Sequence, residues 1–514
     1  MLLKVAFLFI SLSAELVNSA SILFINPSPS YSHQIAFNHL LKELSLRGHK
    51  VTTITSFPIN NSSLTNLTEI SLFDTRDRIM KLINIAGVVH SDDIFSVNDF
   101  LWEASVIVVK EALSQKPVQD LLSSPQTFDL VIVKYYYPNF LALGRKYNCP
   151  TITVSSYFLD DYFYYISGNP VNPVAHPNMM IPAVERLTFQ ERLMSVLHTI
   201  YRWYGIRRIY LPDFQSIMEE HFNMSVPIDD LIDDVDLTFV SVHPVLQEIR
   251  ALGPNTITIG HSREPTVCRP LPTDLKRFMD NAEDGFIYFS LGSNVKSENL
   301  DRKLLRVIVE GLKELPIKVM WKFEGELEHK PKNVYLIKWA PQHEVLRHPN
   351  IKLFITQGGF QSMEEAIYSA VPMVVIPFFV DQRHNAKLIE KKGVGKIVRR
   401  ASLTKEDFMN SINEVLNNSS YKENVTKLRK LAFDVPMDGL EKAIWWIEYV
   451  IRNKGAKHLR NPVVDVPLYQ YFLLDVICFL VLVLLATIFI ACLVVRFLLN
   501  RFVTTTKLKY NKNE

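Results

Sequence analysis

Glycines and polar side chains between residues 354 and 382 follow an order that suits a phosphate ligand. The stretch reads FITQGGFQSMEEAIYSAVPMVVIPFFVDQ: a strand-like apolar run meets Gln357-Gly358-Gly359, and a helical pattern begins at Phe360. Glycine permits positive φ and close backbone approach, and a helix N-terminus offers unpaired N–H groups at the positive end of its dipole. The spacing therefore predicts a site for a phosphate or a diphosphate.

Polar residues in the following turns suit a sugar and a nucleoside. Gln361 and Ser362 add hydrogen-bond donors in the first helical turn, and Glu365 is placed one turn later to accept from a ribose diol. Asp381 and Gln382 follow another strand and offer an acceptor and an amide to sugar hydroxyls.

Two upstream segments complete this set. FSLGS gives a second glycine turn with Ser293, and KWAPQ supplies Trp339 as a flat face for a base and Gln342 as a polar contact. A Gly-Gly pair alone usually marks only a tight turn, whereas the whole ordered set is much more specific.

His33, in PSYSHQ, is the candidate general base. An imidazole titrates near neutrality and can take a proton from a hydroxyl. A lone histidine in a turn is by default a solvated or capping residue, but His33 directly follows the first strand, at the edge where a ligand cleft is expected.

The elements that must position these residues alternate between strand and helix patterns. SILFINP, VTTIT, DLVIV and TITVS are short, β-branched and unalternating, as buried parallel strands are. Between the first two, a helical pattern ends at Gly48. This rhythm predicts a parallel sheet covered by helices, with ligands at the carboxyl ends of the strands.

The pattern divides the chain into two α/β domains. We expect the first over 21–260, a proline-rich linker over 261–284, and the second over 285–455, ending in the amphipathic helix GLEKAIWWIEYVIRN. Residues 157–225 are rich in aromatics and prolines, and predict a long irregular stretch that lines an apolar pocket or packs on its own aromatics.

Both ends of the chain indicate a secretory membrane protein. Residues 1–20 are typical of a cleaved signal peptide. After a stem over 456–474, residues 475–497 predict a membrane-spanning helix, and the basic tail 498–514 predicts a type I orientation with both domains lumenal. Of the rest of the chain, aromatic residues 157–165 would be our candidate for a second membrane contact.

Other features agree with this compartment. Seven asparagines open N-x-S/T triplets and are candidate glycosylation sites: Asn60, Asn61, Asn66, Asn223, Asn417, Asn418 and Asn424. Cys149 and Cys268, the two cysteines outside the predicted span, are too few for a disulfide scaffold or a zinc site. The tail ends KYNKNE and lacks the second lysine of a dilysine retrieval signal.

Composition excludes two broad classes. Hydrophobic content of 48% with 21% charged residues is typical of a globular chain rather than a disordered one. A net charge of +3 over 514 residues is too small to indicate the basic surface of a nucleic-acid-binding protein, so no nucleic-acid partner is expected.

The ordered motifs resemble those of the UDP-glycosyltransferases, the membrane-anchored family that includes UDP-glucuronosyltransferases. YSHQ, FDLVIV, YFSLGS, KWAPQ, the 354–382 stretch and the terminal anchor carry the resemblance along nearly the whole chain. It implies a GT-B fold, in which two Rossmann-like domains face each other across a cleft. It also implies a UDP-sugar donor with no cofactor, a small lipophilic acceptor, and inversion at the anomeric carbon of the sugar. The implied role is detoxification or metabolite conjugation, and the implied location is the endoplasmic reticulum.

The resemblance also implies roles for single residues. Trp339 would stack on uracil, and Gln342 and Glu365 would bind the ribose. Ser293, Gly359 and Ser362 would bind the diphosphate, Asp381 and Gln382 would bind the sugar, and His33 would be the base.

Gln357 departs from the His-Gly-Gly of vertebrate members. Together with Gln361-Ser362 it resembles the insect and insect-virus branch, which generally uses UDP-glucose. A glutamine can donate a hydrogen bond to a phosphate but carries no positive charge. We therefore expect glucose rather than glucuronate.

Lys134 is the second departure, because in the family an acid follows the FDLVIV-type strand and orients the base. A lysine there would lower the pKa of His33, unless it turns outward and another group replaces the acid. Two hypotheses follow: an enzyme with reduced activity, or a catalytically silent member that binds a lipophilic ligand or modulates other transferases.

A D-x-D motif at Asp234 and Asp236 would bind metal in the other large glycosyltransferase fold, but its acidic context indicates a solvated loop, and no metal is expected. The sequence leaves a homo-oligomer open.

Overall fold

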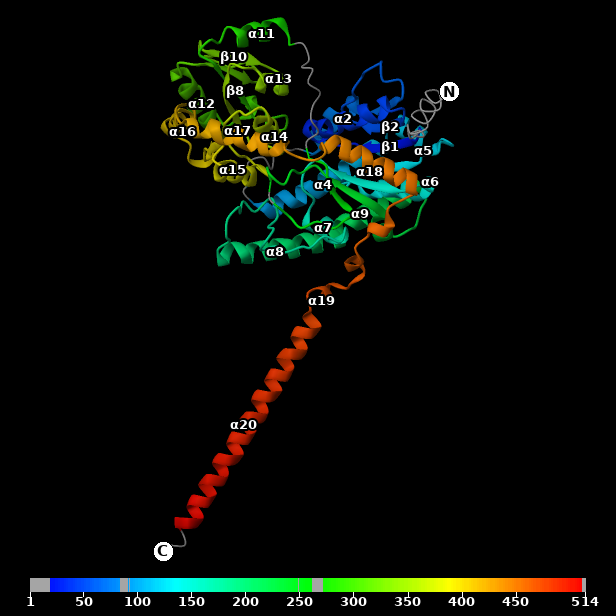
Figure 1. Cartoon of the computed structure of the whole chain (residues 1–514), viewed down its shortest axis with the longest axis vertical. Helices are drawn as coiled ribbons and strands as arrows, with labels where there is room; N and C mark the ends of the chain where they lie inside the picture. Colours follow the sequence, from blue (N-terminus) through cyan, green and yellow to red (C-terminus); the bar gives the residue numbers. More distant parts are fainter. Residues whose placement is uncertain (1–18, 84–90, 92, 248, 261–270, 511–514) are drawn as a thin grey trace, which may run out of the picture. The chain divides into compact units, whose positions relative to one another are not determined.

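Short apolar runs rich in β-branched residues form two separate parallel sheets (Figure 1). The computed structural model describes residues 19–83, 91, 93–247, 249–260 and 271–510. The chain divides into one compact unit that ends at Arg460 and a second that begins at Asn461, and both sheets belong to the first unit. The expected pair of Rossmann-like domains is confirmed.

The first sheet has seven parallel strands in the order β3-β2-β1-β4-β5-β6-β7. Their bounds are β1 Ser21–Asn26, β2 Lys50–Thr55, β3 Leu67–Ser71, β4 Leu130–Lys134, β5 Thr151–Ser155, β6 Val235–Val240 and β7 Thr256–Thr258. In the register, Ile25 pairs with Val133 and Lys134 pairs with Val154. The residues that follow β1, β4 and β5 therefore meet at one edge of the sheet.

The second sheet has six parallel strands in the order β10-β9-β8-β11-β12-β13. Their bounds are β8 Phe286–Ser290, β9 Lys318–Lys322, β10 Val334–Ile337, β11 Ile351–Thr356, β12 Met373–Val375 and β13 Gly395–Ile397. Thr356 of β11 pairs with Ser290 on one side and Val375 on the other. This register brings the turns after β8, β11 and β12 together.

Helices cover both faces of each sheet and bury two apolar clusters per sheet. In the first half of the chain they are α2 Tyr31–Leu46, α3 Phe73–Ile83, α4 Ile94–Leu113, α5 Lys116–Ser123, η2 Pro138–Leu141, α6 Ala142–Tyr147, α7 Asp161–Ile166, α8 Phe189–Gly205, η3 Ile206–Tyr210, α9 Leu211–Phe222 and α10 Ile228–Asp233. In the second half they are α11 Thr273–Asp280, η4 Ser297–Asn299, α12 Arg302–Glu314, α13 Gln342–Leu346, α14 Phe360–Tyr368, α15 Gln382–Lys391, η5 Arg400–Ser402, α16 Lys405–Asn417, α17 Ser419–Phe433, α18 Gly439–Asn453 and η6 Lys457–Leu459.

Helix α18 packs on the first sheet, although its sequence lies in the range 285–455 that we expected to form the second domain. Its buried residues Ala443, Ile444, Ile447 and Val450 join the cluster beneath β1, β4, β5 and β6. Gly439 permits this crossing, because a Cβ there would lie 1.5 Å from the carbonyl oxygen of Ile259. Periodicity showed an amphipathic helix, but it could not show which sheet the apolar face would cover.

The stretch 157–225 is not the long irregular segment that its composition predicts. It contains α7, α8, η3 and α9, and leaves residues 167–188 as a loop. Tyr162, Phe163 and Tyr164 of α7 are buried in the core of the first domain. Residues 157–165 are therefore no candidate for a second membrane contact.

Several sequence predictions fall partly outside the described residues. The predicted signal peptide is described only at its last two residues, and Cys268 lies in the undescribed part of the predicted linker 261–284. The described part of that linker contains α11. Six glycosylation candidates are exposed, whereas Asn66 is half-buried and donates from Nδ2 to the carbonyl of Ser45. Their glycosylation stays a prediction.

The second unit contains η7 Pro462–Asp465, α19 Leu468–Tyr471 and α20 Leu474–Tyr510. Within α20, an 18-residue window reaches a mean hydropathy of 3.3, which makes α20 the one helix of the described chain that is long and apolar enough to cross a membrane. Its length fits the predicted span at 475–497.

Candidate active site

His33 lies in the first turn of α2, directly after the turn that ends β1. Gln34 fixes this turn from inside: its Nε2 donates to the carbonyl of Ser28 at 2.9 Å, and its Oε1 accepts from Thr55 Oγ1 at 2.9 Å. Asn26 Nδ2 donates to the backbone carbonyl of His33 at 3.0 Å. These buried bonds hold the imidazole at the carboxyl edge of the first sheet.

A cavity of about 180 Å³ opens between the two domains beside His33. Its wall includes six of the residues predicted from sequence: His33, Gln357, Gly359, Gln361, Asp381 and Gln382. Apolar side chains also line it, with Met80 and Ile83 from α3 and Phe100, Leu101 and Val108 from α4. Polar groups that suit a sugar and an apolar surface therefore share one cavity.

Burial makes the imidazole of His33 a weak base. Its ring lies 5.3 Å from the ring of Tyr157, centroid to centroid. Desolvation, and then the charge of Lys134, lower the pKa of His33 well below its ordinary value. At neutral pH the ring is thus unprotonated and able to accept a proton.

Lys134 does not turn outward. Its side chain is fully buried at the end of β4, where Nζ donates to Ser156 Oγ at 3.0 Å and lies 5.9 Å from the centroid of Tyr157. Desolvation lowers the pKa of Lys134 to about 7. Among the described residues, no carboxylate forms a hydrogen bond with the His33 imidazole, and the hydroxyl of Tyr157 donates to Tyr136 instead.

The glycine turn of the second domain forms as predicted, between β11 and α14. Gly358 has φ +80°, and a Cβ there would lie 2.6 Å from Val375 Cγ1. Gly292 of FSLGS makes room for Gln357, whose Nε2 would lie 2.2 Å from a Cβ at position 292. Gln382 Nε2 donates to Gln357 Oε1 at 3.1 Å. The two glycine turns and the Asp-Gln pair therefore form one constellation.

Asp381 faces the N-terminus of α14. Its Oδ2 accepts from the backbone N–H of Phe360 at 3.2 Å and from Asn385 Nδ2 at 2.6 Å. Desolvation raises the pKa of Asp381 to about 6. The carboxylate thus engages one of the N–H groups that we assigned to a phosphate from the sequence.

The residues predicted to bind the nucleoside form a neighbouring cluster outside the cavity wall. Gln342 Nε2 donates to Glu365 Oε2 at 2.6 Å and to Ser362 Oγ at 3.0 Å. Trp339 is half exposed; Lys322 Nζ lies 5.5 Å from its ring, and the ring of Tyr31 meets it edge-on at 4.9 Å. Ser293 is half-buried in the turn after β8.

Sequence reasoning missed three residues that line the cavity and the hydrogen bonds that join the two domains. Asn294 lines the cavity and accepts from Ser30 Oγ at 3.2 Å, and Gln361 Nε2 donates to the carbonyl of Ser156 at 2.8 Å. Tyr136 and Tyr137 also line the cavity. The aromatic run that follows FDLVIV in the sequence could have indicated these two tyrosines. No local sequence pattern indicates the hydrogen bonds between the domains.

The D-x-D motif is not a solvated loop. Asp236 is buried at the start of β6, where it accepts from the backbone N–H groups of Thr151 at 3.0 Å and Ala456 at 2.7 Å. Asp234 pairs with Arg145 at 2.5 Å. Both aspartates thus hold protein segments together, and the described residues contain no group of three His, Cys, Asp or Glu side chains that could hold a metal ion.

Comparisons with known proteins agree with this geometry. The family model described as "UDP-glucoronosyl and UDP-glucosyl transferase" matches residues 21–509. UDP-glucosyltransferase 2 of Dactylopius coccus is 32% identical over 95% of each chain, and human UDP-glucuronosyltransferase 2B10 is 31% identical over 90% of each chain. The solved structure of the glycotransferase of kitacinnamycin, 18% identical, has a TM-score of 0.56 over 85% of this chain and all of its own, and shares the GT-B fold.

Proposed function

The chain belongs to the family of UDP-glucuronosyl and UDP-glucosyl transferases, whose members transfer a sugar from a UDP-sugar to an acceptor, and we propose that this protein transfers a hexose to a hydroxyl of a small lipophilic acceptor with inversion. One observation carries the proposal. His33 lines the same cavity as Gln357, Gly359, Asp381 and Gln382, and apolar residues of α3 and α4 line it too. An acceptor bound on those apolar residues would bring its hydroxyl to the base and the sugar.

The proposed reaction is a single displacement at the anomeric carbon. The acceptor oxygen bonds to this carbon while the imidazole of His33 takes the hydroxyl proton, and the bond to UDP breaks with its electron pair on the phosphate. N–H groups at the start of α14 and the side-chain amide of Gln357 would stabilise the departing charge. Asp381 and Gln382 would hold the sugar hydroxyls.

We propose UDP-glucose as the preferred donor. Gln357 is neutral, and the guanidinium of Arg383 donates to the carbonyls of Ser91 and Phe378, both at 3.4 Å, rather than lining the cavity. Among the described residues, the cavity wall therefore offers no lysine or arginine to a sugar carboxylate. The two relatives differ in their donor names at nearly equal identity, so the cavity is the better guide.

The test is turnover by the full-length protein in purified membranes with a panel of phenols. Transfer from labelled UDP-glucose should exceed transfer from UDP-glucuronate, and His33→Ala membranes provide the blank. Equal or faster transfer from UDP-glucuronate would contradict the donor assignment, and Arg383→Gln would then show whether that side chain moves to bind the carboxylate.

Lys134 supports a second candidate function. Position 134 holds a buried amine, whereas the family resemblance implies an acid there that orients the base. This difference favours a catalytically silent member that binds a lipophilic ligand or modulates other transferases. UDP binding without transfer to any phenol would support that function over the enzyme.

We further propose a type I anchor by α20, with both domains in the lumen of the endoplasmic reticulum, where conjugation of lipophilic compounds would serve detoxification. Protease protection of residues 21–460, but not of the tail, in sealed microsomes tests this topology. Sensitivity of the glycans to endoglycosidase H tests the compartment.

A further inference from the structure

Helix α8 has its polar face inside and its apolar face outside. Its buried residues are Ser195, His198, Thr199, Arg202 and Gly205. The opposite side exposes Phe189, Leu193, Leu197, Ile200 and Tyr204, with Phe189 at 70%, Ile200 at 60% and Tyr204 at 66% exposure. A surface helix of a soluble protein has the reverse arrangement.

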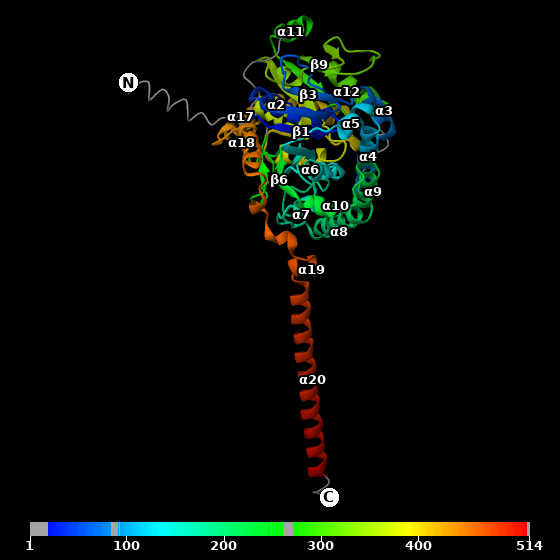
Figure 2. The same ribbon diagram turned by 90° about the vertical axis from the view of Figure 1, so that its right-hand side faces the viewer.

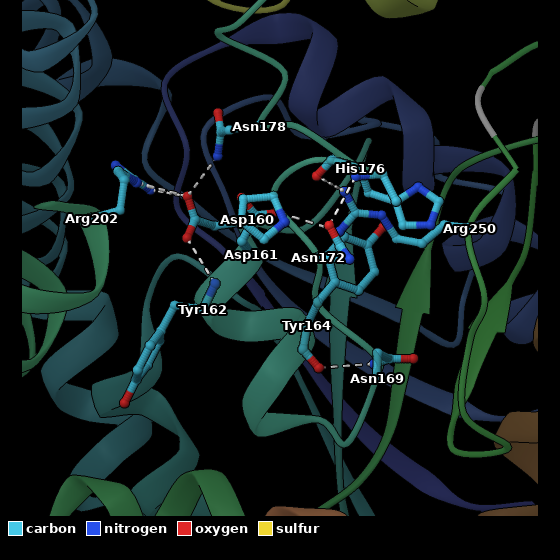
Figure 3. Close-up of polar contacts among 12 residues, drawn as sticks. Asp160, Asp161, Tyr162, Tyr164, Asn169, Asn172, His176, Asn178, Arg202 and Arg250 are labelled. Carbon is cyan, nitrogen blue, oxygen red and sulfur yellow. Dashed lines mark hydrogen bonds and ion pairs between the residues drawn. The ribbon is translucent and has the colours of Figure 1, made fainter. Parts of the chain in front are cut away.

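A buried polar network fixes this orientation (Figure 3). Arg202 pairs with Asp160, which also caps α7 through the N–H of Tyr162 at 3.1 Å. Arg202 also donates to Asn98 Oδ1 at 2.8 Å, and Asn98 Nδ2 donates to His198 at 2.7 Å. Rotating the helix to bury its apolar side would leave the carboxylate of Asp160 buried without its cation, which is strongly destabilising.

The exposed residues form one continuous stripe. Positions 189, 193, 197, 200 and 204 fall within an arc of about 80° at the helical period, so they share a single side of α8. Arg207 and Arg208 of η3, which directly follows α8, are also exposed. A helix with such a face and basic residues at its end suits a lipid interface.

Chain connectivity limits how far the predicted anchor can begin from the stripe. Arg207, just after α8, pairs with Asp229 at one end of α10, and Arg460 pairs with Asp233 at the other end. These two aspartates lie about 6 Å apart along the helix axis. Residues 461–473 then allow at most about 45 Å of chain before α20 begins.

We propose that the outer face of α8 lies in the interface of the membrane that α20 enters, as a second contact of the lumenal part with lipid. The proposal rests on the anchoring by α20 put forward above. Figure 2 shows α7, α8, α9 and α10 together at one end of the first domain, as an interfacial surface would require.

This contact would bring lipid close to the acceptor side of the cavity. Gly205 of α8 packs against Trp102 of α4, where a Cβ would lie 1.9 Å from the indole. The same helix α4 supplies Phe100, Leu101 and Val108 to the cavity wall. A lipophilic acceptor dissolved in the membrane would then be one helix away from its binding wall.

Fluorescence quenching tests the contact in the full-length protein. Ile200→Trp and, as a control on an exposed helix of the second domain, Leu431→Trp are reconstituted in phosphatidylcholine vesicles with brominated acyl chains. The fluorescence added at position 200 should be lost in brominated lipid, whereas that at position 431 should persist. Equal quenching at both positions, or at neither, overturns the proposal.

A protease site inserted in the stem gives an independent test. After cleavage, the globular part of the wild type should stay on the vesicles, and the variant Leu193→Gln, Leu197→Gln, Ile200→Gln should be released. A matched variant carrying Leu46→Gln, Ile249→Gln and Leu431→Gln should stay bound, and UDP binding by each checks its folding.

The other outcomes separate the possible errors. Release of the wild type as a monomer overturns the α8 contact, and release as a dimer that the α8 variant cannot form shows that the stripe binds a second copy instead. Retention of the α8 variant also overturns the proposal. Failure of the uncleaved chain to associate with vesicles overturns the anchoring by α20 itself.

Discussion

Lys134 donates a 3.0 Å hydrogen bond from Nζ to Oγ of Ser156, and both residues are buried at the carboxyl ends of adjacent strands. The backbone carbonyl of Ser156 also accepts from Gln361 of the second domain at 2.8 Å. The amine thus lies 5.9 Å from the ring centroid of Tyr157, which lines the cavity, and close enough to His33 to lower the pKa of its imidazole.

Replacing this amine by a carboxylate should raise activity. In Lys134→Asp the side chain can accept the imidazole N–H and stabilise the imidazolium that forms during transfer, so we expect turnover to rise about tenfold or more. His33→Ala should abolish turnover. The measurement is kcat for transfer from labelled UDP-glucose to the best phenol.

Lys134→Met serves as the control, because it removes the charge without adding an acceptor, and its turnover should fall between those of the wild type and the Asp variant. If the wild type binds UDP but transfers no sugar, and Lys134→Asp shows no gain in turnover, the protein is the catalytically silent family member.

The same pair predicts a pH dependence. Below pH 7 Lys134 is protonated, so its charge weakens His33 as a base. Above pH 7 the amine is neutral and this effect is lost. Turnover of the wild type should therefore increase as the pH rises through about 7. A kcat profile for Lys134→Met should lack this rise; an identical rise there would assign the titration to another group.

The parts of the site that depend on local chemistry could be read from the sequence. Gly358 and Gly292 are needed where the backbone approaches a neighbour, and β-branched runs such as LVIV form buried parallel strands wherever helices cover them. The orientation of Lys134 could not be read, because it depends on Ser156 and Tyr157 from another strand.

Contacts between the domains were also beyond sequence reasoning. Gln361 was assigned to the donor from its place in the first turn of α14, yet its amide reaches across to Ser156. The sequence also could not show that the polar side of α8 faces the protein interior, because only the fold shows that Arg202 pairs with Asp160.

Removing the carboxylate of Glu365 should weaken binding of the nucleoside. Gln342 Nε2 lies 2.6 Å from Glu365 Oε2 and orients it, and loss of a charged hydrogen-bond partner typically costs about 1–3 kcal/mol. Calorimetry with UDP should therefore show a correspondingly higher Kd for Glu365→Ala. Glu423→Ala, on the exposed side of α17, is the matched control and should bind UDP as the wild type does. Undiminished binding by Glu365→Ala would refute the ribose assignment.

Breaking the buried pair between α8 and α7 should destabilise the first domain. Arg202→Met leaves the carboxylate of Asp160 buried without its cation, which costs about 3–5 kcal/mol of unfolding free energy. Arg207→Met, five residues along the same segment, removes only an exposed pair with Asp229 and should cost less than about 1 kcal/mol. Denaturant unfolding of the full-length protein in detergent, followed by the tryptophan fluorescence of this domain, compares the two variants. The double variant Arg202→Met, Asp160→Leu should recover part of the loss, because no unpaired charge then remains, although the Asp160 cap of α7 is lost. Equal losses in the two single variants would show that the buried pair contributes no more than a surface one.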